Sequence, residues 1–321
     1  MGPVSCRRIL ITGASGTLGY NVVRLLSSDS RYQLFLPLRT PRPDLFDPNE
    51  RLQVFECNLS DGRQTREIVA RCKPDVVVHC AASGLRPPRP AWFEMTTFNV
   101  DATLRLFETC CAFEQLHFIY ISTGLVYREQ SRPLSEVDPI ETLHPYGASK
   151  SAADSLLRAA AAEFDRKLTL LRPFSFTGLH DGGSRLFPSL LRAAAEQKPL
   201  DLSPGEQIRD FCSVKDIARA ILAVIDSGHL SPIETLNLGS ASCESLKELV
   251  IRVCHELNLT VDLRFGARSY HPYEPMHLVA NIEKAFAVLG WRPCENVASS
   301  VWDLARSQFP ALSVTRPRID I

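Results

Sequence analysis

Short apolar runs alternate with longer amphipathic segments along the first half of this chain. Runs of four to eight apolar residues bounded by turn-forming residues are typical of buried strands. Six such runs predict strands at Arg8–Thr12, Gln33–Arg39, Leu52–Leu59, Asp75–Ala81, His117–Thr123 and Leu168–Pro173. Four segments between them have helical spacing, at Thr17–Ser28, Asp61–Cys72, Phe93–Phe113 and Pro145–Asp165. The alternation predicts an α/β fold, a doubly wound parallel sheet with helices on both faces.

The regular alternation ends after Pro173. Five further helices are predicted at Ser184–Gln197, Val214–Ser227, Glu244–Asn258, Asn281–Leu289 and Val297–Gln308. Three further strands are predicted at Arg209–Val214, Thr235–Gly239 and Val261–Phe265. We expect residues 1–174 and 209–240 to form the main domain, and residues 175–208 and 241–321 to form a smaller mixed lobe. Ligands of such sheets bind at the carboxyl ends of the strands, so the binding cleft is expected to face this lobe.

Composition and charge narrow the class of protein. Of the 321 residues, 45% are hydrophobic and 22% are charged, and the formal net charge is zero. A neutral chain has no overall field that attracts nucleic acid or an anionic membrane, so we expect neither as a partner. No apolar run approaches the roughly 20 residues of a membrane span, and no signal peptide is recognised before the first strand, so we expect a cytoplasmic protein. The ten cysteines contain no Cys-x-x-Cys pair; zinc and disulfides remain alternatives, but free buried thiols are favoured and no metal site is expected.

A glycine-rich turn lies between the first predicted strand and the first predicted helix. Gly13 permits the tight turn, Gly16 lets the backbone approach a pyrophosphate, and Gly19 allows close packing of the helix on the sheet. The N–H groups at the start of the helix then face the phosphates of a dinucleotide. Residues of this turn that we expect to bind the cofactor are Gly13, Ser15, Gly16, Thr17, Leu18 and Gly19.

The residue that follows the second strand bears on the choice between NAD and NADP. An acidic residue there binds the free ribose 2′-hydroxyl of NAD, whereas this chain has Arg39, with Arg42 nearby. A guanidinium suits a 2′-phosphate, so NADPH is the expected cofactor and NAD remains possible. The alternative is that Arg39 is an ordinary solvated surface residue.

A candidate catalytic group combines the end of the fifth strand with the start of the following helix. Ser122 and Thr123 end the strand, and Tyr146 and Lys150 lie four residues apart on one helical face. A tyrosine has an ordinary pKa of about 10, and lowering it by about 3 units requires roughly 4 kcal/mol of differential stabilisation. The Lys150 ammonium and the positive charge of an oxidised nicotinamide favour the phenolate. Tyr146 is then a general acid or base towards a sugar oxygen that Thr123 also hydrogen-bonds, while Lys150 holds the nicotinamide ribose. The alternative is an exposed Tyr–Lys pair without catalytic meaning.

Several motifs together resemble the extended short-chain dehydrogenase/reductases of the NAD-dependent epimerase/dehydratase type, over essentially the whole chain. The motifs are Gly13–Gly19, Val78–Ala82, Asn99, Ser122–Thr123, Tyr146–Lys150, Leu171–Phe174, Gly205–Phe211 and Leu289–Pro293. The resemblance implies a Rossmann domain, a nucleotide-sugar substrate bound by the smaller lobe, and a homodimer built from the helices Phe93–Phe113 and Pro145–Asp165. It implies further cofactor-binding residues at Asn58, Leu59, Cys80, Ala81, Ala82, Asn99 and Pro173. It also implies substrate-binding residues at Ser122, Thr123, Arg86, Ser175, Arg209 and His271, with Arg209 on the diphosphate.

The family that this chain resembles contains epimerases, dehydratases, decarboxylases and reductases of nucleotide sugars. The 4,6-dehydratases have Asp-Glu after the catalytic threonine, whereas this chain has Gly124–Leu125, which cannot transfer protons. The segments 205–211 and 265–281 are similar to those of abequose-synthase-like proteins, so we expect an NADPH-dependent 4-ketoreductase of a nucleotide-linked 4-keto-6-deoxyhexose. The alternatives are an NAD-dependent nucleotide-sugar 4-epimerase and a dinucleotide-binding regulator without turnover. The nucleotide and the sugar are not predicted.

The chain departs from the family pattern at several positions. His271 stands where an arginine that helps bind the diphosphate is usual, which increases the expected contribution of Arg209. Tyr273 replaces a usual glycine, and Ser175 replaces a usual asparagine on the substrate side. Asn58 replaces a usual aspartate near the adenine and keeps a hydrogen-bonding side chain there.

Overall fold

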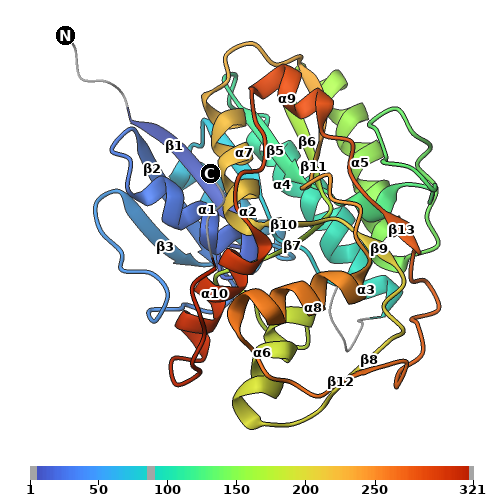
Figure 1. Cartoon of the computed structure of the whole chain (residues 1–321). Coiled ribbons are helices and arrows are strands. Elements are labelled where there is room, and N and C mark those ends of the chain that lie inside the picture. Colours follow the sequence, from blue (N-terminus) through green and yellow to red (C-terminus); the bar gives the residue numbers. More distant parts are fainter. Residues whose placement is uncertain (1–5, 85–90, 318–321) are drawn as a thin grey trace.

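A seven-stranded parallel sheet forms the centre of the computed structural model, which describes residues 6–84 and 91–317 (Figure 1). Its strands, in spatial order, are β11 (Ile233–Leu238), β6 (Lys167–Pro173), β5 (His117–Ile121), β4 (Val76–His79), β1 (Arg7–Thr12), β2 (Tyr32–Leu38) and β3 (Leu52–Glu56). The direction of winding reverses between β1 and β4, because β2 follows β1 on one side and β4 pairs with it on the other. This topology confirms the predicted doubly wound α/β fold and places a ligand-binding crevice at the carboxyl ends of β1 and β4.

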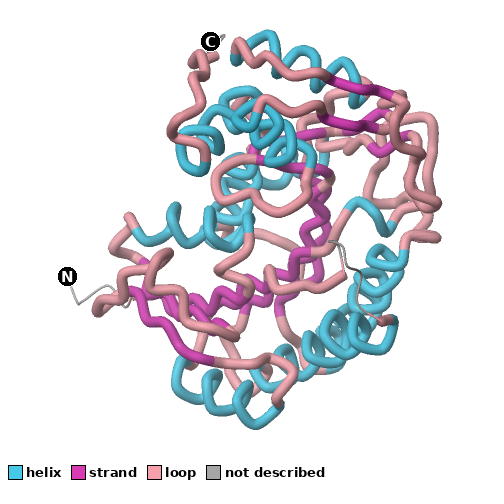
Figure 2. Tube along the Cα trace, turned by 90° about the horizontal axis from the view of Figure 1, so that it is seen from below, coloured by secondary structure: helices cyan, strands magenta, loops and turns pink. Residues whose placement is uncertain are grey.

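Successive side chains of each strand point to opposite faces of the sheet, and both faces are buried. Ile9 and Ile11 of β1 belong to one apolar core, whereas Leu10 between them belongs to another. The first core is covered by α1 (Thr17–Ser27), α7 (Val214–Asp226) and α9 (Glu283–Leu289). The second core is covered by α2 (Gly62–Cys72), α4 (Ala102–Cys110) and α5 (Pro145–Glu163). Figure 2 shows the strands as a middle layer between these helices.

A third apolar core lies beyond the carboxyl ends of the strands. It joins α6 (Leu186–Glu196), α8 (Leu246–Leu257) and α10 (Val297–Gln308), which lie below the sheet in Figure 1. Three pairs of short parallel strands accompany these helices: β7 (Ser175–Thr177) with β10 (Phe211–Ser213), β8 (Leu200–Leu202) with β12 (Leu263–Phe265), and β9 (Ile208–Arg209) with β13 (His277–Leu278). The chain therefore places a second layer of structure over the crevice.

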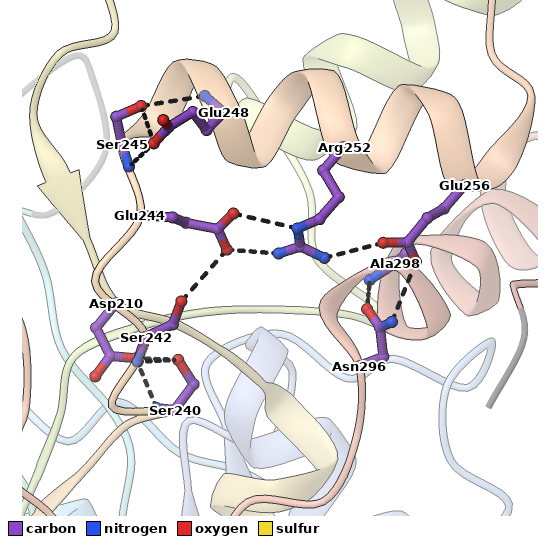
Figure 3. A network of polar contacts seen from close by, with 10 residues as sticks. All are labelled: Asp210, Ser240, Ser242, Glu244, Ser245, Glu248, Arg252, Glu256, Asn296 and Ala298. Carbon is purple, nitrogen blue, oxygen red and sulfur yellow. Dashed lines mark hydrogen bonds and ion pairs between the residues drawn. The ribbon is translucent and has the colours of Figure 1, made fainter. Parts of the chain in front are cut away.

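A chain of polar contacts joins this region to the end of the main sheet (Figure 3). The buried Asp210 carboxylate accepts hydrogen bonds from the backbone N–H groups of Ser240, Ala241 and Ala280. On α8, Arg252 pairs with Glu244 at 2.5 Å and with Glu256 at 3.1 Å. Further contacts of the network connect Ser242 to Glu244, Ser245 to Glu248, Glu256 to Asn296 and Asn296 to Ala298. The segment after β11, α8 and the start of α10 are thus held together at one place.

The predicted helix Phe93–Phe113 is wrong as a single element. The structure has α3 (Trp92–Thr96), a π-helical turn (Thr97–Asp101) and then α4, which ends at Cys110. The turn contains Asn99, whose side chain bonds both the N–H and the C=O of Ser83 and the hydroxyl of Ser149. These long-range contacts stabilise a turn that local propensity does not favour.

The predicted strand Arg209–Val214 is also wrong as one strand, because buried Asp210 separates β9 from β10. In the described part of the chain, no helix has the length and apolarity to cross a membrane.

Candidate active site

A cleft of about 770 Å³ opens at the carboxyl ends of the central strands. One side of the cleft is formed by the glycine-rich turn Gly13–Gly19, the ends of β4, β5 and β6, and the start of α5. The other side is formed by β7, α6 and the loop before β13. Predicted site residues that line it are Gly13, Gly16, Thr17, Leu18, Gly19, Cys80, Ala82, Ser122, Thr123, Tyr146, Pro173, Ser175 and Arg209. The fold thus brings residues from distant parts of the sequence to one cavity of ligand-binding size.

The glycine turn has the geometry of a close backbone approach. Gly13 has a φ of +66°, and a Cβ added there would lie 2.6 Å from the backbone nitrogen of Ala81. A Cβ on Gly19 would collide with the Gly13 carbonyl oxygen. Gly16 is the N-cap of α1 and offers no side-chain cap to the first-turn N–H groups. Donors and the positive end of the helix dipole therefore face the cleft, as an anionic ligand requires.

Besides the glycine-rich turn, Ser122 also indicates that a polar ligand fits this cleft. Its hydroxyl oxygen is buried and, within residues 6–84 and 91–317, has no hydrogen-bond partner. A buried hydroxyl without a partner is costly, and this one lies at the end of β5 on the cleft wall. Together with the glycine cradle, it makes the cleft a fit for a dinucleotide with a phosphate group and polar edges.

Thr123 and Tyr146 come together because the two segments that carry them pack tightly. Thr123 is the N-cap of a 3₁₀ turn (Gly124–Val126), and its hydroxyl oxygen accepts the Leu125 N–H at 3.2 Å. A Cβ on Gly147, the residue after Tyr146, would collide with the Leu125 carbonyl. Gly147 therefore lets the start of α5 rest on the turn that begins at Thr123. Thr123 also lines the cleft, where its hydroxyl can meet a bound ligand.

Burial dominates the electrostatics of the Tyr146 and Lys150 pair. Burial raises the pKa of Tyr146, and the charge of Asp154 adds to this effect, while the positive charge of Arg185 opposes it. Burial lowers the pKa of Lys150 to about 7, opposed by the charge of Asp154. The Lys150 ammonium is only 1% exposed and does not line the cleft surface. Both groups are thus shifted towards their neutral forms, and added positive charge beside the phenol is needed to ionise it.

Asp154 lies one helical turn beyond Lys150 and forms a buried ion pair. Arg172, at the end of β6, donates to its carboxylate at 3.0 and 3.2 Å, and the two side chains are 1% and 2% exposed. Arg172 also donates to the Tyr127 hydroxyl at 2.8 Å, which in turn donates to Asn237. This network holds α5, the helix that carries Tyr146, against β6.

Several residues of the cleft lining escaped the sequence analysis, among them Arg185, Glu274 and His144. Arg185 and Glu274 line the cavity from the second layer, and His144 caps the start of α5. Arg209 pairs with Glu274 at 2.5 Å, so its charge is compensated by a carboxylate on the cleft wall. Position 274 belongs to a loop, and Arg185 precedes a helix without any motif, so no local pattern identifies either residue. His144 precedes Pro145 and Tyr146, and this neighbourhood is the one available signal.

Other predicted site residues lie outside the cleft lining. Asn99 and Lys150 are buried behind it, Leu59 is buried beside β3, and the backbone of Ala81 packs on Gly13. Ser15 accepts a hydrogen bond from His180 on its carbonyl, and Asn58 is exposed and accepts the Ser60 N–H. Arg39 is exposed at the end of β2. His271 is exposed, with its ring 6.4 Å from that of His144. Arg86 lies outside the described residues.

Comparisons with known proteins agree with this geometry. The model of the family described as "NAD dependent epimerase/dehydratase family" matches residues 9–239. The chain is similar to the "Uncharacterized UDP-glucose epimerase YtcB" of Bacillus subtilis, at 28% identity over 90% of this chain and 94% of that protein. It is also similar to dTDP-glucose 4,6-dehydratase 1 of Escherichia coli, at 28% identity over 94% of each chain.

Among solved structures, the UDP-glucuronic acid 4-epimerase of Bacillus cereus, in complex with UDP-glucuronic acid and NAD, has a TM-score of 0.82. Its identity is 26%, and the alignment covers 92% of this chain and 96% of that one.

Proposed function

This chain belongs to the NAD-dependent epimerase/dehydratase family, and from that premise we propose that it is a nucleotide-sugar 4-epimerase with a bound nicotinamide dinucleotide. The family and the fold agree with the sequence-based expectation. The choice of reaction changes, because the epimerases among the relatives support the alternative expectation better than the 4-ketoreductase that the sequence favoured. Relatives that are dehydratases do not alter this choice, since Gly124 and Leu125 supply no proton-transfer group after Thr123.

One observation carries the proposal. Thr123 and Tyr146 line the same cleft as the glycine turn, and Lys150 lies behind them on the helix of Tyr146. When bound, the dinucleotide supplies a hydride acceptor and donor for the sugar carbon. Tyr146 removes the proton from the 4-hydroxyl and later returns it to the same oxygen. Thr123 donates a hydrogen bond to that oxygen, and Lys150 holds the nicotinamide ribose and favours the Tyr146 phenolate.

Positive charge is needed for this chemistry because burial raises the pKa of Tyr146. Asp154 favours the protonated form of Lys150, and Arg185 acts on Tyr146 directly. An ammonium one helical turn from the phenol, together with the guanidinium, supports ionisation of Tyr146 once substrate and cofactor exclude water.

The residue Arg39 supports a ketoreductase as the second candidate function. It follows β2 directly and is exposed, and no hydrogen bond or ion pair joins it to the described residues. By contrast, Arg42 pairs with Asp44 at 2.6 Å. A free guanidinium at this edge suits the 2′-phosphate of NADPH, and an exchangeable NADPH is the reductant of a ketoreductase. We propose NADPH as the preferred cofactor if the enzyme is a reductase.

We further propose that the lobe of residues 175–208 and 241–321 binds the nucleotide sugar. Ser175 of this lobe lines the cleft together with Arg209, which directly follows residue 208 in β9, and Ser122 lines it just after the end of β5. We also propose a homodimer through α4 and α5, because Leu156 of α5 and Phe164 at its end are exposed apolar residues. Light scattering of the protein, with and without Leu156→Asp, tests the dimer.

The reaction itself is tested by incubating the enzyme with UDP-glucose, UDP-glucuronate and dTDP-glucose and following the sugars by NMR. Interconversion of two 4-epimers without net consumption of dinucleotide supports the epimerase. Stoichiometric consumption of NADPH with a nucleotide 4-ketosugar supports the ketoreductase instead. Tight binding of dinucleotide without turnover of any sugar would favour a regulator and contradict both enzymes.

A further inference from the structure

The ammonium of Lys150 lies against the face of an aromatic ring behind the cleft. Its Nζ atom is 3.9 Å from the centre of the Tyr120 ring, and both side chains are buried in the layer between the sheet and α5. Among the residues that the structure describes, this ammonium has no hydrogen bond or ion pair, so the ring face takes the place of a polar partner. The face of an aromatic ring attracts a cation, most strongly where water is excluded.

Several titratable groups around Lys150 carry no charge near pH 7. His79 and Cys80 follow each other at the end of β4, where burial lowers the pKa of His79 to about 3 and raises the pKa of Cys80 to about 12. Burial likewise raises the pKa of Tyr146, one helical turn before Lys150 on α5. These three groups therefore supply no negative charge to balance the ammonium.

Asp154 supplies negative charge from the next turn of α5, but another cation already uses it. Arg172 on β6 donates to the Asp154 carboxylate at 3.0 and 3.2 Å, in an ion pair that is itself buried. A carboxylate that is paired with a guanidinium stabilises a second cation much less, because the two charges largely cancel at a distance. The charge of Lys150 consequently depends on the Tyr120 ring face as well as on Asp154.

The Tyr120 ring is held in place by a neighbour on the adjacent strand. His79 of β4 is its register partner, and the two rings lie 5.8 Å apart with 19° between their planes. Both ring nitrogens of His79 are hydrogen-bonded, to the Thr12 hydroxyl at 2.7 Å and to the Thr103 hydroxyl at 2.9 Å. Because β1, β4 and α4 together fix His79, the Tyr120 ring is ordered before any ligand enters the cleft.

Resting on the proposed part of Lys150 in the reaction, we propose that Tyr120 is a positioning residue for Lys150: its ring face holds the ammonium in place and favours the charged form of the lysine. Tyr120 is absent from the cleft lining and therefore acts through Lys150. The charged lysine then holds the nicotinamide ribose and favours the Tyr146 phenolate. Burial opposes this charge, since it lowers the pKa of Lys150 to about 7, and the ring limits the decrease.

Two substitutions separate the ring of Tyr120 from its hydroxyl. Tyr120→Phe keeps the ring face and removes a buried hydroxyl that has no hydrogen-bond partner within the described ranges, whereas Tyr120→Leu removes the ring. Phe118→Leu is the matched control, because Phe118 lies on the same strand, is equally buried and belongs to the same core. The recorded ring contacts of Phe118 are with His79 and Phe107, and not with Lys150.

The first measurement is the pKa of Lys150 itself, without substrate or cofactor. NMR follows the ε carbons of ¹³C-labelled lysines as the pH changes, and Lys150→Met identifies the signal. Wild type, Tyr120→Phe and Phe118→Leu should titrate near pH 7. Tyr120→Leu should titrate roughly 0.5 to 1.5 pH units lower, which is the free energy of a desolvated cation–π contact expressed as a pKa.

The second measurement is the affinity for NADH and NADPH as a function of pH, followed by their fluorescence. Because the charged lysine holds the ribose, Tyr120→Leu should bind about threefold to thirtyfold more weakly than wild type at pH 8, which is the same pKa change written as a ratio. At pH 5 the lysine is charged in both proteins, and their affinities should agree within about twofold. A role of Tyr120 in packing alone would weaken binding equally at both pH values.

Thermal melting shows which variants are folded. If Tyr120→Leu does not fold, Tyr120→Met replaces it, because the longer and more flexible methionine fills irregular gaps in a core.

Three results would overturn the assignment of Tyr120 while leaving the proposed function intact. These are an unchanged or higher Lys150 pKa in a folded variant without the ring, an equal fall in Tyr120→Phe, and an equal fall in Phe118→Leu. Conversely, the expected fall of the Lys150 pKa in a protein that turns over no nucleotide sugar would support Tyr120 and contradict the proposed function.

Discussion

The Nζ atom of Lys150 lies 3.9 Å from the centre of the Tyr120 ring, in a cation–π arrangement that is buried behind the cleft. The ring face offers partial compensation for a desolvated ammonium, and Asp154 offers a negative charge. Burial still prevails, since the pKa of Lys150 falls to about 7. The fold thus holds a lysine that is costly to charge until an anionic or polar cofactor enters.

Lys150→Met should stabilise the cofactor-free protein, and more at pH 6 than at pH 9. A lysine with a lower pKa in the folded chain than in the unfolded chain binds fewer protons when folded, so wild-type stability rises as the pH increases from about 7 towards about 10.4. Below pH 7 the full cost of burying the charge is present. Methionine removes this cost, so the melting temperature at pH 6 should rise by roughly 2 °C or more.

The control for this prediction is Lys198→Met, because Lys198 is exposed beside Glu196. Its melting temperature should follow that of wild type at both pH values. A Lys150→Met protein that melts below wild type at pH 6 would show that the ammonium contributes net stability in the absence of cofactor.

Tyr146→Phe should reduce turnover by about 10²–10⁴-fold, because it removes the proton-transferring hydroxyl and little else. The phenyl ring keeps the packing of the start of α5, so the dissociation constant for the dinucleotide, measured by its fluorescence, should stay within a few-fold of wild type. Tyr270→Phe is the matched control, since Tyr270 lies away from the cleft lining. Turnover at the wild-type rate in Tyr146→Phe would eliminate Tyr146 as acid and base.

Gly13→Ala should lower the free energy of unfolding by about 2–4 kcal/mol, from overpacking and from the left-handed backbone at this position. Dinucleotide binding should be lost as well, because the turn must move away from Ala81 to make room for a Cβ. The comparison is Gly182→Ala, where an added Cβ would meet nothing within 4 Å. Chemical denaturation of both variants measures the difference, and equal stabilities would contradict the close approach at Gly13.

If the enzyme is the ketoreductase, Arg39→Asp should shift its cofactor preference from NADPH towards NADH. An aspartate repels a 2′-phosphate and accepts hydrogen bonds from a free 2′-hydroxyl, and losing one charged hydrogen bond corresponds to about tenfold or more in NADPH affinity. Arg42→Asp controls for a general change of charge, since Arg42 is engaged with Asp44. Equal ratios of NADPH to NADH affinity in wild type and Arg39→Asp would remove the basis for NADP preference.

The strands and helices of the main sheet were predictable because each carries a signal within its own sequence. The strand β4 is buried on both faces and the helix α1 on one face, as in any doubly wound fold. The apolar run of β4 and the amphipathic spacing of α1 reflect this burial directly. The two- and three-residue strands β7, β8, β9 and β13 are too short for any period, and they form through pairing with distant segments. The π-helical turn likewise depends on Ser83 and Ser149, which are far from Asn99 in sequence.

The candidate site likewise contains residues that the sequence identifies and residues that it does not. Gly13, Tyr146 and Lys150 belong to local motifs, and the spacing within each motif determines how these residues are arranged. Arg185 and Glu274 reach the cleft from segments without a motif, and the loop of Glu274 meets β9 only in the folded chain. Arginine is common in any sequence, so only its three-dimensional placement distinguishes a cleft-lining arginine from a surface arginine.

The π-helical turn at Thr97–Asp101 has a consequence for how this chain tolerates changes of length. Such a turn contains one residue more than an α-helix needs, and each residue of an α-helix advances by about 100°. Deleting one residue here would leave every cleft-lining side chain in the sequence, yet it would swing Asn99 away from both Ser83 and Ser149. The loop after β4 and the helix of Tyr146 are therefore kept in register by a single inserted residue, and a shorter chain would need another way to couple them.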